Sequence, residues 1–374
     1  MNKWVKGTSL ALATVVLIAV ATVLVAKEMG ERKMQRIVSV PAEHLLLPAA
    51  KVSVEQGRYL YATRGCADCH GASGAGKEVI RSGAMVVNSP NITRGANSAT
   101  IAYVDADWVR TLRHGIKPDG TPLMIMPSED YNRLSDDDVA SIIAYVQQMP
   151  PVPGQRGLVQ LPVAVKVLYA FGHVKDAAEM IDHTLPPQKP VPAAVSLEHG
   201  AYVANSCVGC HGAQLSGGKI PGAPPEWPAP ANLTPGNGSG MKHYPTPEAF
   251  MAMLRSGKRP DGSTISNVMP FGSLREMNDV DVRALHSYLR TLPPARGGGT
   301  VRRRARSGLP DPAYRRDRVL PHAETIVAAG AQDLALASEV GMLAKLPLAR
   351  LDHKRGGAVI EIDVLERTNF IVDR

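Results

Sequence analysis

Two short motifs restrict this chain more than any of its other features. The segment "CADCHGASGAGK" begins at Cys66, and the segment "CVGCHGAQLSGGK" begins at Cys207. The four cysteines of the chain all belong to these two segments, and in each a histidine follows the second cysteine directly. Any fold of this chain must therefore form two Cys-x-x-Cys-His segments, and their four thiols have no other cysteine in the chain as a partner.

Three kinds of chemistry use the Cys-x-x-Cys spacing. A zinc site can take one thiol pair from each motif, and a redox dithiol needs only one pair. A c-type haem uses both thiols as thioether anchors and the adjacent histidine as an axial iron ligand. Only the last chemistry explains why the histidine occurs twice, so we expect two covalently bound haem c groups, with zinc or structural disulfides as alternatives. The predicted haem-binding residues are Cys66, Cys69, His70, Cys207, Cys210 and His211.

The chain repeats itself at an offset near 142 residues. "PNIT" at residues 90–93 aligns with "ANLT" at 231–234, and "LRHGIKPDG" at 112–120 aligns with "LRSGKRPDG" at 254–262. The segment "MPSEDYNRLSDDDVASIIAYVQQMP" likewise matches "MPFGSLREMNDVDVRALHSYLRTLP". A period of this length indicates two whole domains and not a solenoid.

Each half of the repeat has a helical pattern. Ser53 and Gln56 form a possible capping box before the first motif, and Ser135 can cap a helix that begins with three aspartates. Middle helices are expected at 105–112 and 246–254. Neither half shows a convincing alternating strand pattern, so we predict an all-α fold. The expected apolar faces of the last helices are Val139, Ile142, Ile143 and Val146 in the first half, and Val282, Leu285 and Leu289 in the second.

These observations predict five segments. Residues 1–36 contain a cytoplasmic lead, a transmembrane anchor and a juxtamembrane stretch. Residues 37–150 and 195–295 form two tandem domains, separated by a Pro-rich linker at 151–194 that holds one short helix. Residues 296–374 form a basic tail of unknown role, in which we expect a largely disordered extension with one helix and one short strand.

The N-terminal segment predicts a membrane anchor. It begins "MNKWVK" and then carries no charge from Gly7 to Ala26, which is long enough to cross a hydrocarbon core as a helix. The basic lead places the N-terminus in the cytoplasm and the two domains in the periplasm. A cleaved signal peptide is the alternative, with a processing site near Ala21. Because the apolar run continues to Val25, we favour an anchor retained in the bacterial inner membrane.

The charge distribution gives no reason to expect a nucleic-acid partner. The net charge is +8, but residues 1–36 carry six basic and two acidic groups, and residues 296–374 carry fourteen and ten. Each end therefore contributes +4, and residues 37–295 hold 22 groups of each sign. The central domains are neutral overall, so the basic isoelectric point says little about partners. In the tail, "VRRRARSG" can contact anionic lipid or lie in solvent.

Each domain has one methionine that is a candidate for the second axial ligand of its iron. Met126 aligns with Met269, and each is followed by a proline in a loop before the last helix of its domain. They lie 56 and 58 residues after the motif histidines. A methionine is more often core packing, and that alternative stays open. The histidines after the motifs do not align with one another. The predicted iron ligands are therefore His70, Met126, His211 and Met269.

A histidine and a methionine together have a functional consequence. A thioether ligand raises the reduction potential of haem iron, and two axial ligands leave no position open for a substrate. Two weaker expectations concern the surroundings. Arg113 and Arg255 either reach a haem propionate or lie as solvated helix ends. The carbonyl just before Asn91 or Asn232 can accept the other ring N–H of the motif histidine.

Taken together, residues 52–295 resemble a tandem pair of class I cytochrome c domains. The run from Cys-x-x-Cys-His through "PNIT", "LRHG…PDG" and "MP…LSDDDVASIIAYV" resembles the cytochrome subunits of periplasmic membrane-bound dehydrogenases, the quinoprotein alcohol and gluconate types. Those subunits usually carry three haem domains, and this chain has two motifs. An anchor followed by two haem domains is also similar to the dihaem subunit of cbb3-type oxidases.

The resemblance implies a carrier of single electrons and not an enzyme with catalytic residues of its own. The expected donor is a periplasmic dehydrogenase or a quinone-side protein, and the expected acceptor lies further along the respiratory chain. A cbb3-type oxidase subunit is one alternative. A dihaem peroxidase is another, and it requires an open iron site with acid–base residues above it.

Overall fold

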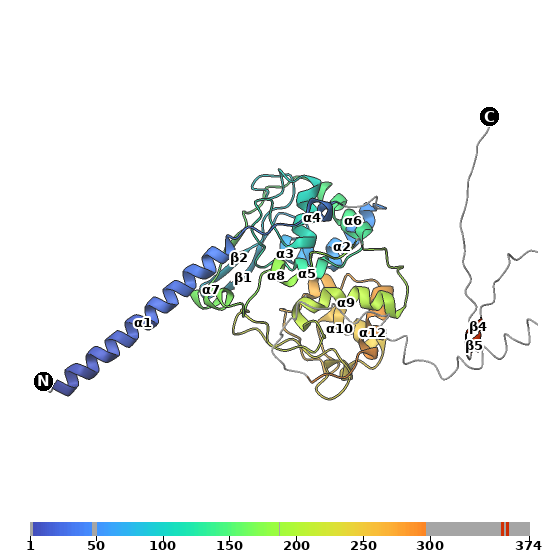
Figure 1. The fold of residues 1–374 in the computed structure, drawn as a ribbon. Helices are drawn as coiled ribbons and strands as arrows, with labels where there is room; N and C mark the ends of the chain where they lie inside the picture. The colour runs from blue at the N-terminus through green and yellow to red at the C-terminus, as the bar shows by residue number, and fades with distance from the viewer. Residues whose placement is uncertain (1–2, 47–50, 187, 297–352, 355–356, 359–374) are drawn as a thin grey trace, which may run out of the picture. The chain divides into compact units, whose positions relative to one another are not determined.

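The computed structural model describes residues 3–46, 51–186, 188–296, 353–354 and 357–358. It divides the chain into two compact units, Met1–Asp311 and Pro312–Arg374. Both cysteine motifs lie in the first unit, which Figure 1 shows as a long N-terminal helix followed by mainly helical domains.

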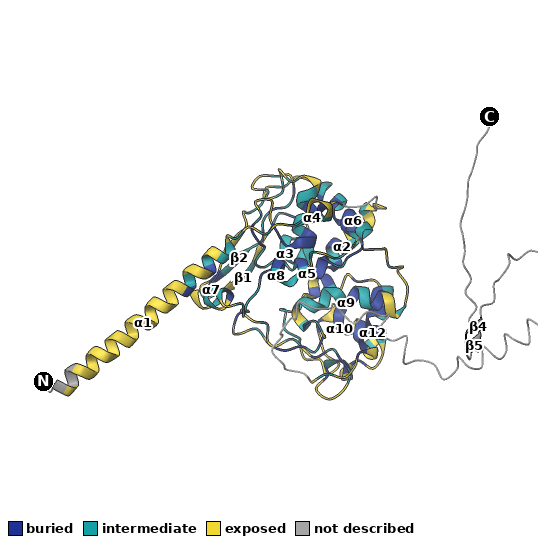
Figure 2. Cartoon of the chain, in the orientation of Figure 1, coloured by how far each residue is buried: buried dark blue, intermediate teal, exposed yellow. Residues whose placement is uncertain are grey.

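The N-terminal helix α1 (Lys3–Met34) fits a membrane anchor. Its segment Gly7–Met34 is the one helix in the described part of the chain that is long and apolar enough to cross a membrane, with a mean hydropathy of 2.6. The apolar side chains between Leu10 and Val25 are exposed, as the yellow colour of α1 in Figure 2 shows. Burial begins at Ala26, which is 3% exposed.

The first domain surrounds one helical core. A short 3-10 helix, η1 (Ala42–Leu45), comes before α2 (Val54–Thr63), α3 (Cys66–His70), α4 (Asp105–His114), α5 (Ser128–Tyr131) and α6 (Asp136–Gln147). The predicted caps Ser53 and Ser135 are confirmed, because Ser53 accepts a hydrogen bond from the Gln56 N–H and Ser135 accepts one from the Asp138 N–H. The capping box does not form, because the Gln56 side chain bonds to Asp138 instead. The core contains the predicted apolar face of α6, which is Val139, Ile142, Ile143 and Val146. Leu60, Trp108 and Leu134 from other parts of the domain pack with this face.

The second domain repeats this plan. A single helix, α9 (Leu197–His211), takes the place of α2 and α3, and it is followed by η2 (Gly240–His243), α10 (Pro247–Ser256), α11 (Phe271–Leu274) and α12 (Asp279–Thr291). Thr246 caps α10 by accepting from the Ala249 N–H. The predicted apolar face of α12 is buried in the core, with Val203, Leu254, Val282, Leu285 and Leu289.

In each domain the first and last helices cross at a glycine. A Cβ atom added at Gly57 would lie under 3.0 Å from the Ser141 carbonyl, and one added at Gly200 would lie equally close to the Ala284 carbonyl. Only glycine allows two helix backbones to approach this closely. The crossing brings α2 against α6, and α9 against α12.

The prediction of an all-α fold is wrong for the first domain, which also contains a small sheet. Strands β1 (Glu78–Ser82), β2 (Met85–Asn88) and β3 (Leu158–Gln160) pair antiparallel in the order β1-β2-β3. The strands are three to five residues long, and the β1–β2 register shifts between Glu78 and Ile80, so no extended alternation exists in the sequence. The sheet instead depends on its own cluster of Ile80, Met85, Val87 and Leu161.

The segment at 151–194 holds more structure than the single short helix predicted for it. It contributes β3 to the sheet and forms two helices, α7 (Val163–Ala170) and α8 (Ala177–Met180). Helix α7 packs along the end of α1, where a Cβ atom at Gly30 would collide with the Lys166 backbone. This linker is therefore part of the folded unit.

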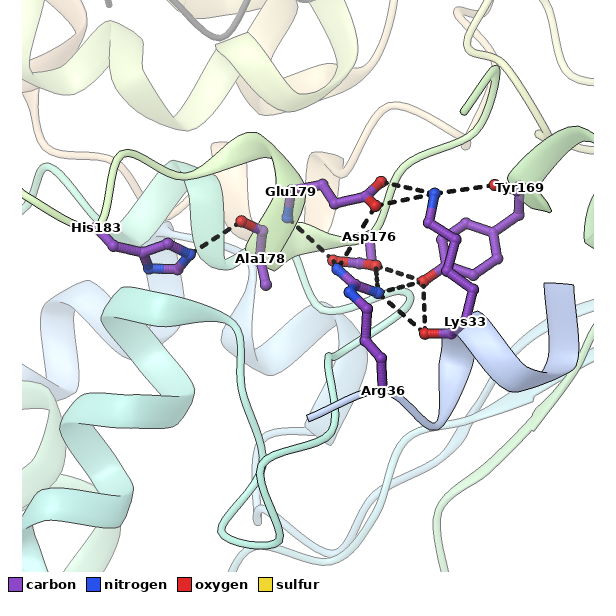
Figure 3. Close-up of polar contacts among 7 residues, drawn as sticks. All are labelled: Lys33, Arg36, Tyr169, Asp176, Ala178, Glu179 and His183. Carbon is purple, nitrogen blue, oxygen red and sulfur yellow. Dashed lines mark hydrogen bonds and ion pairs between the residues drawn. The ribbon is translucent and has the colours of Figure 1, made fainter. Parts of the chain in front are cut away.

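Ion pairs hold the end of α1 to this linker (Figure 3). Arg36 donates two hydrogen bonds to the carboxylate of Asp176, at 2.6 and 3.1 Å, and the Tyr169 hydroxyl donates to the same carboxylate at 2.5 Å. Lys33 pairs with Glu179 at 2.8 Å. Asp176 is completely buried. Although burial raises the pKa of Asp176, the bonds from Arg36 and Tyr169 lower it overall.

The second unit contributes two described strands. Strands β4 (His353–Lys354) and β5 (Gly357–Ala358) pair antiparallel. The arginine cluster and the helix predicted for the tail at 296–374 lie outside the described residues.

Candidate functional site

The two cysteine motifs have the same local backbone. In the first, the Gly71 N–H bonds to the Ala67 carbonyl and the Gly76 N–H bonds to the His70 carbonyl at 2.9 Å. In the second, Gly212 bonds to Val208, and Gly217 bonds to the His211 carbonyl, again at 2.9 Å. Each motif is thus a helical turn that ends at its histidine, followed by a loop that folds back.

The motif histidines are held by the predicted carbonyl groups. His70 donates from Nδ1 to the Pro90 carbonyl at 2.9 Å, and His211 donates from Nδ1 to the Ala231 carbonyl at 2.8 Å. A carbonyl can only accept, so the proton lies on Nδ1 and the lone pair lies on Nε2, the nitrogen left to bind a metal. Burial lowers the pKa of both histidines, which favours this neutral form.

A buried asparagine fixes each accepting segment. Asn91 donates from Nδ2 to the Val152 carbonyl at 2.8 Å, and its Oδ1 accepts from Thr93. Asn232 donates to the Ala295 carbonyl at 2.9 Å and accepts from Thr234. This role was not predicted from the sequence, although the aligned Asn-x-Thr of "PNIT" and "ANLT" is its signal.

Two glycines allow each loop to lie against this segment. Gly76 and Gly217 have φ angles of 78° and 73°, in the left-handed region. A Cβ atom at Gly76 would lie under 3.0 Å from the Ser89 and Pro90 backbone, and one at Gly217 would lie equally close to Pro230. The motif and the carbonyl that holds its histidine are therefore in backbone contact.

None of the four cysteines forms a disulfide. Burial raises the pKa of Cys66 to about 12 and that of Cys207 to about 12. No group of three or more His, Cys, Asp or Glu side chains gathers as a metal site within the described ranges. The geometry does not favour the zinc and disulfide alternatives.

Each predicted methionine lies at the same core as a motif cysteine. Met126 and Cys66 pack against the core of the first domain, and Met269 and Cys207 pack against the core of the second. Both methionines are partly buried. A motif cysteine and a thioether at one core, next to a neutral imidazole whose Nε2 can bind a metal, fit a covalently attached haem.

The comparison with known families decides the class of the chain. A cytochrome c family model matches residues 54–150 and 198–293, which together make up just over half of the chain. The chain belongs to the cytochrome c family. Members of this family bind haem c through Cys-x-x-Cys-His, so the two motifs are the attachment sites that the family implies.

Relatives of this cytochrome are subunits of dehydrogenases. It is 30% identical to the fructose dehydrogenase cytochrome subunit of Gluconobacter japonicus, over 72% of this chain and 59% of that one. It is 26% identical to the alcohol dehydrogenase (quinone) cytochrome c subunit of Gluconobacter oxydans, over 66% of this chain and 56% of the relative. A nicotinate dehydrogenase subunit of Pseudomonas putida is also 26% identical, over 64% of this chain and 21% of the relative.

These matches confirm the resemblance to cytochrome subunits of membrane-bound dehydrogenases. The cytochrome spans less than three-fifths of the length of the dehydrogenase cytochrome subunits it matches.

The two arginines considered as partners of haem propionates each form an ion pair within their own domain. Arg113 is buried and pairs with Asp136 at 2.5 Å, and Arg255 pairs with Asp279 at 2.6 Å. The two aspartates are aligned in the repeat and begin α6 and α12. The duplicated arginine thus joins the middle helix of each domain to its last helix. Because Arg113 is buried, the interpretation that it lies in solvent at a helix end is wrong.

Proposed function

We propose that the chain is a membrane-anchored dihaem c-type cytochrome that relays single electrons in the periplasm. The observation that carries this proposal is the duplicated histidine geometry. His70 and His211 each donate from Nδ1 to a backbone carbonyl, which leaves Nε2 to bind iron, and each directly follows a Cys-x-x-Cys pair that forms no disulfide.

The residues of each domain have separate roles in this proposal. Cys66 and Cys69 attach one haem c and Cys207 and Cys210 attach the other, while Met126 and Met269 supply the second axial ligands. A haem c bound in this way supplies a one-electron iron couple. The Pro90 and Ala231 carbonyls orient the histidine rings, and the buried asparagines hold those carbonyls in place. No residue is assigned a catalytic role.

We place the two domains in the periplasm, behind a retained anchor. The exposed apolar side chains of α1 support retention, because they run from Leu10 to Val25 and so continue past the processing site near Ala21. The relatives support a dehydrogenase subunit as the electron donor, and we propose a downstream respiratory protein as the acceptor.

The test is spectroscopy of the detergent-solubilised protein, matured in a periplasm that attaches haem c. We expect two irons per chain, and a near-infrared band of methionine-ligated ferric haem. Met126→Ala and Met269→Ala should each remove about half of that band, because each would open one of two iron sites. Met124→Ala is the matched control, since Met124 packs at the sheet cluster and not at the core with Cys66.

An unchanged band in both ligand variants would contradict the assignment of the methionines. A peroxidase has an open iron site, so rapid turnover of hydrogen peroxide by the unmodified protein would favour that alternative instead. Colourless protein after periplasmic maturation would refute the proposal as a whole.

A further inference from the structure

The two cytochrome domains contact each other through a pair of equivalent bonds. Tyr59 of the first domain donates from its hydroxyl to Asp281 of the second at 2.7 Å. Tyr202 of the second domain donates in the same way to Asp138 of the first. Tyr59 aligns with Tyr202 in the repeat, and Asp281 aligns with Asp138. The contact between the domains therefore has internal pseudo-two-fold symmetry, as in a dimer with equivalent faces.

The same tyrosines also accept equivalent backbone bonds. The Asn278 N–H donates to the Tyr59 hydroxyl at 3.1 Å, and the Ser135 N–H donates to the Tyr202 hydroxyl at 3.0 Å. Asn278 and Ser135 are the N-caps of α12 and α6. Each tyrosine thus binds the start of the last helix of the other domain.

The haem-binding motifs face the same interface. Asp68, inside the first motif, accepts a bond from the Ser273 N–H at 3.2 Å, just after the Met269 loop of the second domain. Gly209 holds the position of Asp68 in the second motif, and a Cβ atom there would collide with Asp130, just after the Met126 loop. Each motif therefore touches the short helix that follows the predicted methionine of its neighbour.

One buried ion pair breaks this symmetry. Arg64 of the first domain pairs with Asp281 of the second at 2.7 Å, and both side chains are 3% exposed. Asp281 also accepts from Nε2 of His199 at 2.7 Å. Burial by itself raises the pKa of Asp281, but the bonds from His199, Arg64 and Tyr59 lower it overall, so the carboxylate is charged.

Arg64 is connected to both motifs. It lies two residues before Cys66, and the Tyr131 hydroxyl fixes its backbone carbonyl at 3.1 Å. Its partner Asp281 also binds His199 on α9, the helix that ends in the second motif. One buried guanidinium is therefore connected to both haem attachment sites.

We propose that Arg64 is a positioning residue shared by the two haem sites. Through its ion pair with Asp281 it fixes the position of one domain against the other. Its positive charge raises the reduction potential of both haem sites, and the negative charge of Asp281 lowers it. A positive charge near haem iron opposes the loss of an electron, and a negative charge favours it. This inference rests on the proposed dihaem function and adds a residue that relates one haem site to the other.

The test is a potentiometric titration of the full-length cytochrome. Arg64→Met leaves Asp281 without its cation, so both midpoint potentials should shift downward. Asp281→Asn leaves Arg64 without its anion, so both should shift upward. Loss of docking alone would shift the potentials in the same direction in both variants. The matched control is Arg58→Met on the same helix, because Arg58 is exposed and pairs with Glu55 nearby.

Arg64→Lys keeps the charge and should retain potentials close to those of the unmodified protein. If Arg64→Met does not accumulate, the opposite shift in Asp281→Asn and the retained potentials in Arg64→Lys still test the proposal. The proposal would be overturned if the midpoint potentials shifted in the same direction in Arg64→Met and Asp281→Asn. It would also be overturned if Asp281→Asn did not raise the potentials. The absorption spectrum of the unmodified protein tests the dihaem function separately, so the two failures are distinguishable.

Discussion

At the scale of single residues, the site depends on glycines as much as on ligands. Gly76 lies against the backbone of Ser89 and Pro90 with a φ of 78°, and the carbonyl of Pro90 is the one that holds His70. A side chain at residue 76 would push that carbonyl away from the imidazole. The ring orientation of the ligand is therefore controlled by a residue that binds nothing itself.

We predict that Gly76→Ala lowers the free energy of unfolding by more than about 2 kcal/mol, because it adds a backbone collision to the cost of a left-handed alanine. Gly83→Ala is the control, since Gly83 has a φ of 51° with open space around it. That variant should lose only about 1–2 kcal/mol. Urea unfolding measures the free energy of unfolding of both variants. Equal losses in Gly76→Ala and Gly83→Ala would show that the backbone relieves the collision at residue 76 without cost.

A stacked pair of histidines gives the first domain an acid-sensitive point. His114 lies 3.0 Å from His183 between their Nδ1 atoms, and burial lowers the pKa of His114 from 6.5 to about 4. Between these pH values the unfolded chain binds a proton that the folded chain does not, so stability falls as the pH is lowered. Besides His183, the charged or titratable groups around this site are Glu43, His44, Arg113, Asp136 and Asp182.

We predict that His114→Gln reduces the loss of stability between pH 6.5 and about pH 4, because one buried proton-binding site is removed. Urea midpoints across this range measure the effect. The comparison variant is His173→Gln, because His173 is exposed and lies in the same unit. An unchanged slope in His114→Gln would exclude this site as a source of acid sensitivity.

Residue-scale features were predictable where the sequence repeats them. The motif spacing and the aligned "PNIT" and "ANLT" segments located the carbonyls that hold His70 and His211, and the structure confirmed both. The ion pair of Arg113 was not predictable, because its partner Asp136 lies 23 residues away on another helix. A long-range ion pair leaves no local pattern in a single sequence.

At the scale of elements, the junction between α1 and the linker is the clearest addition to the predicted helices. Asp176 is the centre of this junction, since it accepts from Arg36, from Tyr169 and from the Glu179 N–H. The sequence of residues 151–194 predicted only a Pro-rich linker with one short helix. Its contacts join residues more than 130 positions apart, so helical periodicity gives no information about them.

We predict that Asp176→Asn weakens this junction by about 1–3 kcal/mol, because it removes the nearer and completely buried anion of Arg36 and leaves only the longer pair with Glu179. Glu28→Gln removes the exposed pair of Glu28 with Arg32 on the same helix and should cost less than about 1 kcal/mol. Unfolding of the detergent-solubilised protein compares the two variants. Equal effects would mean that the α1 junction is no stronger than a surface ion pair.

At the scale of the whole first unit, the repeat in the sequence predicted two domains but gave no sign that they dock. Tyr59 and Tyr202 occupy aligned positions, yet an aromatic residue on a helix is usually read as part of its own core. The contacts with Asp281 and Asp138 appear only once both domains are folded, because each joins a helix of one domain to the last helix of the other.

Docking of this kind predicts that the two domains unfold together. Tyr59→Phe and Tyr202→Phe each remove a hydroxyl bond to an aspartate together with the bond that the hydroxyl accepts from a backbone N–H, so each should cost at least about 1.5–3 kcal/mol. If both bonds stabilise one interface, losing the first loosens the second, and the double variant should cost less than the sum of the single ones. Calorimetry of the unmodified protein should then show one transition for both domains. Strict additivity, with two separate transitions, would mean that the domains fold independently and that the tyrosines stabilise only their own surroundings.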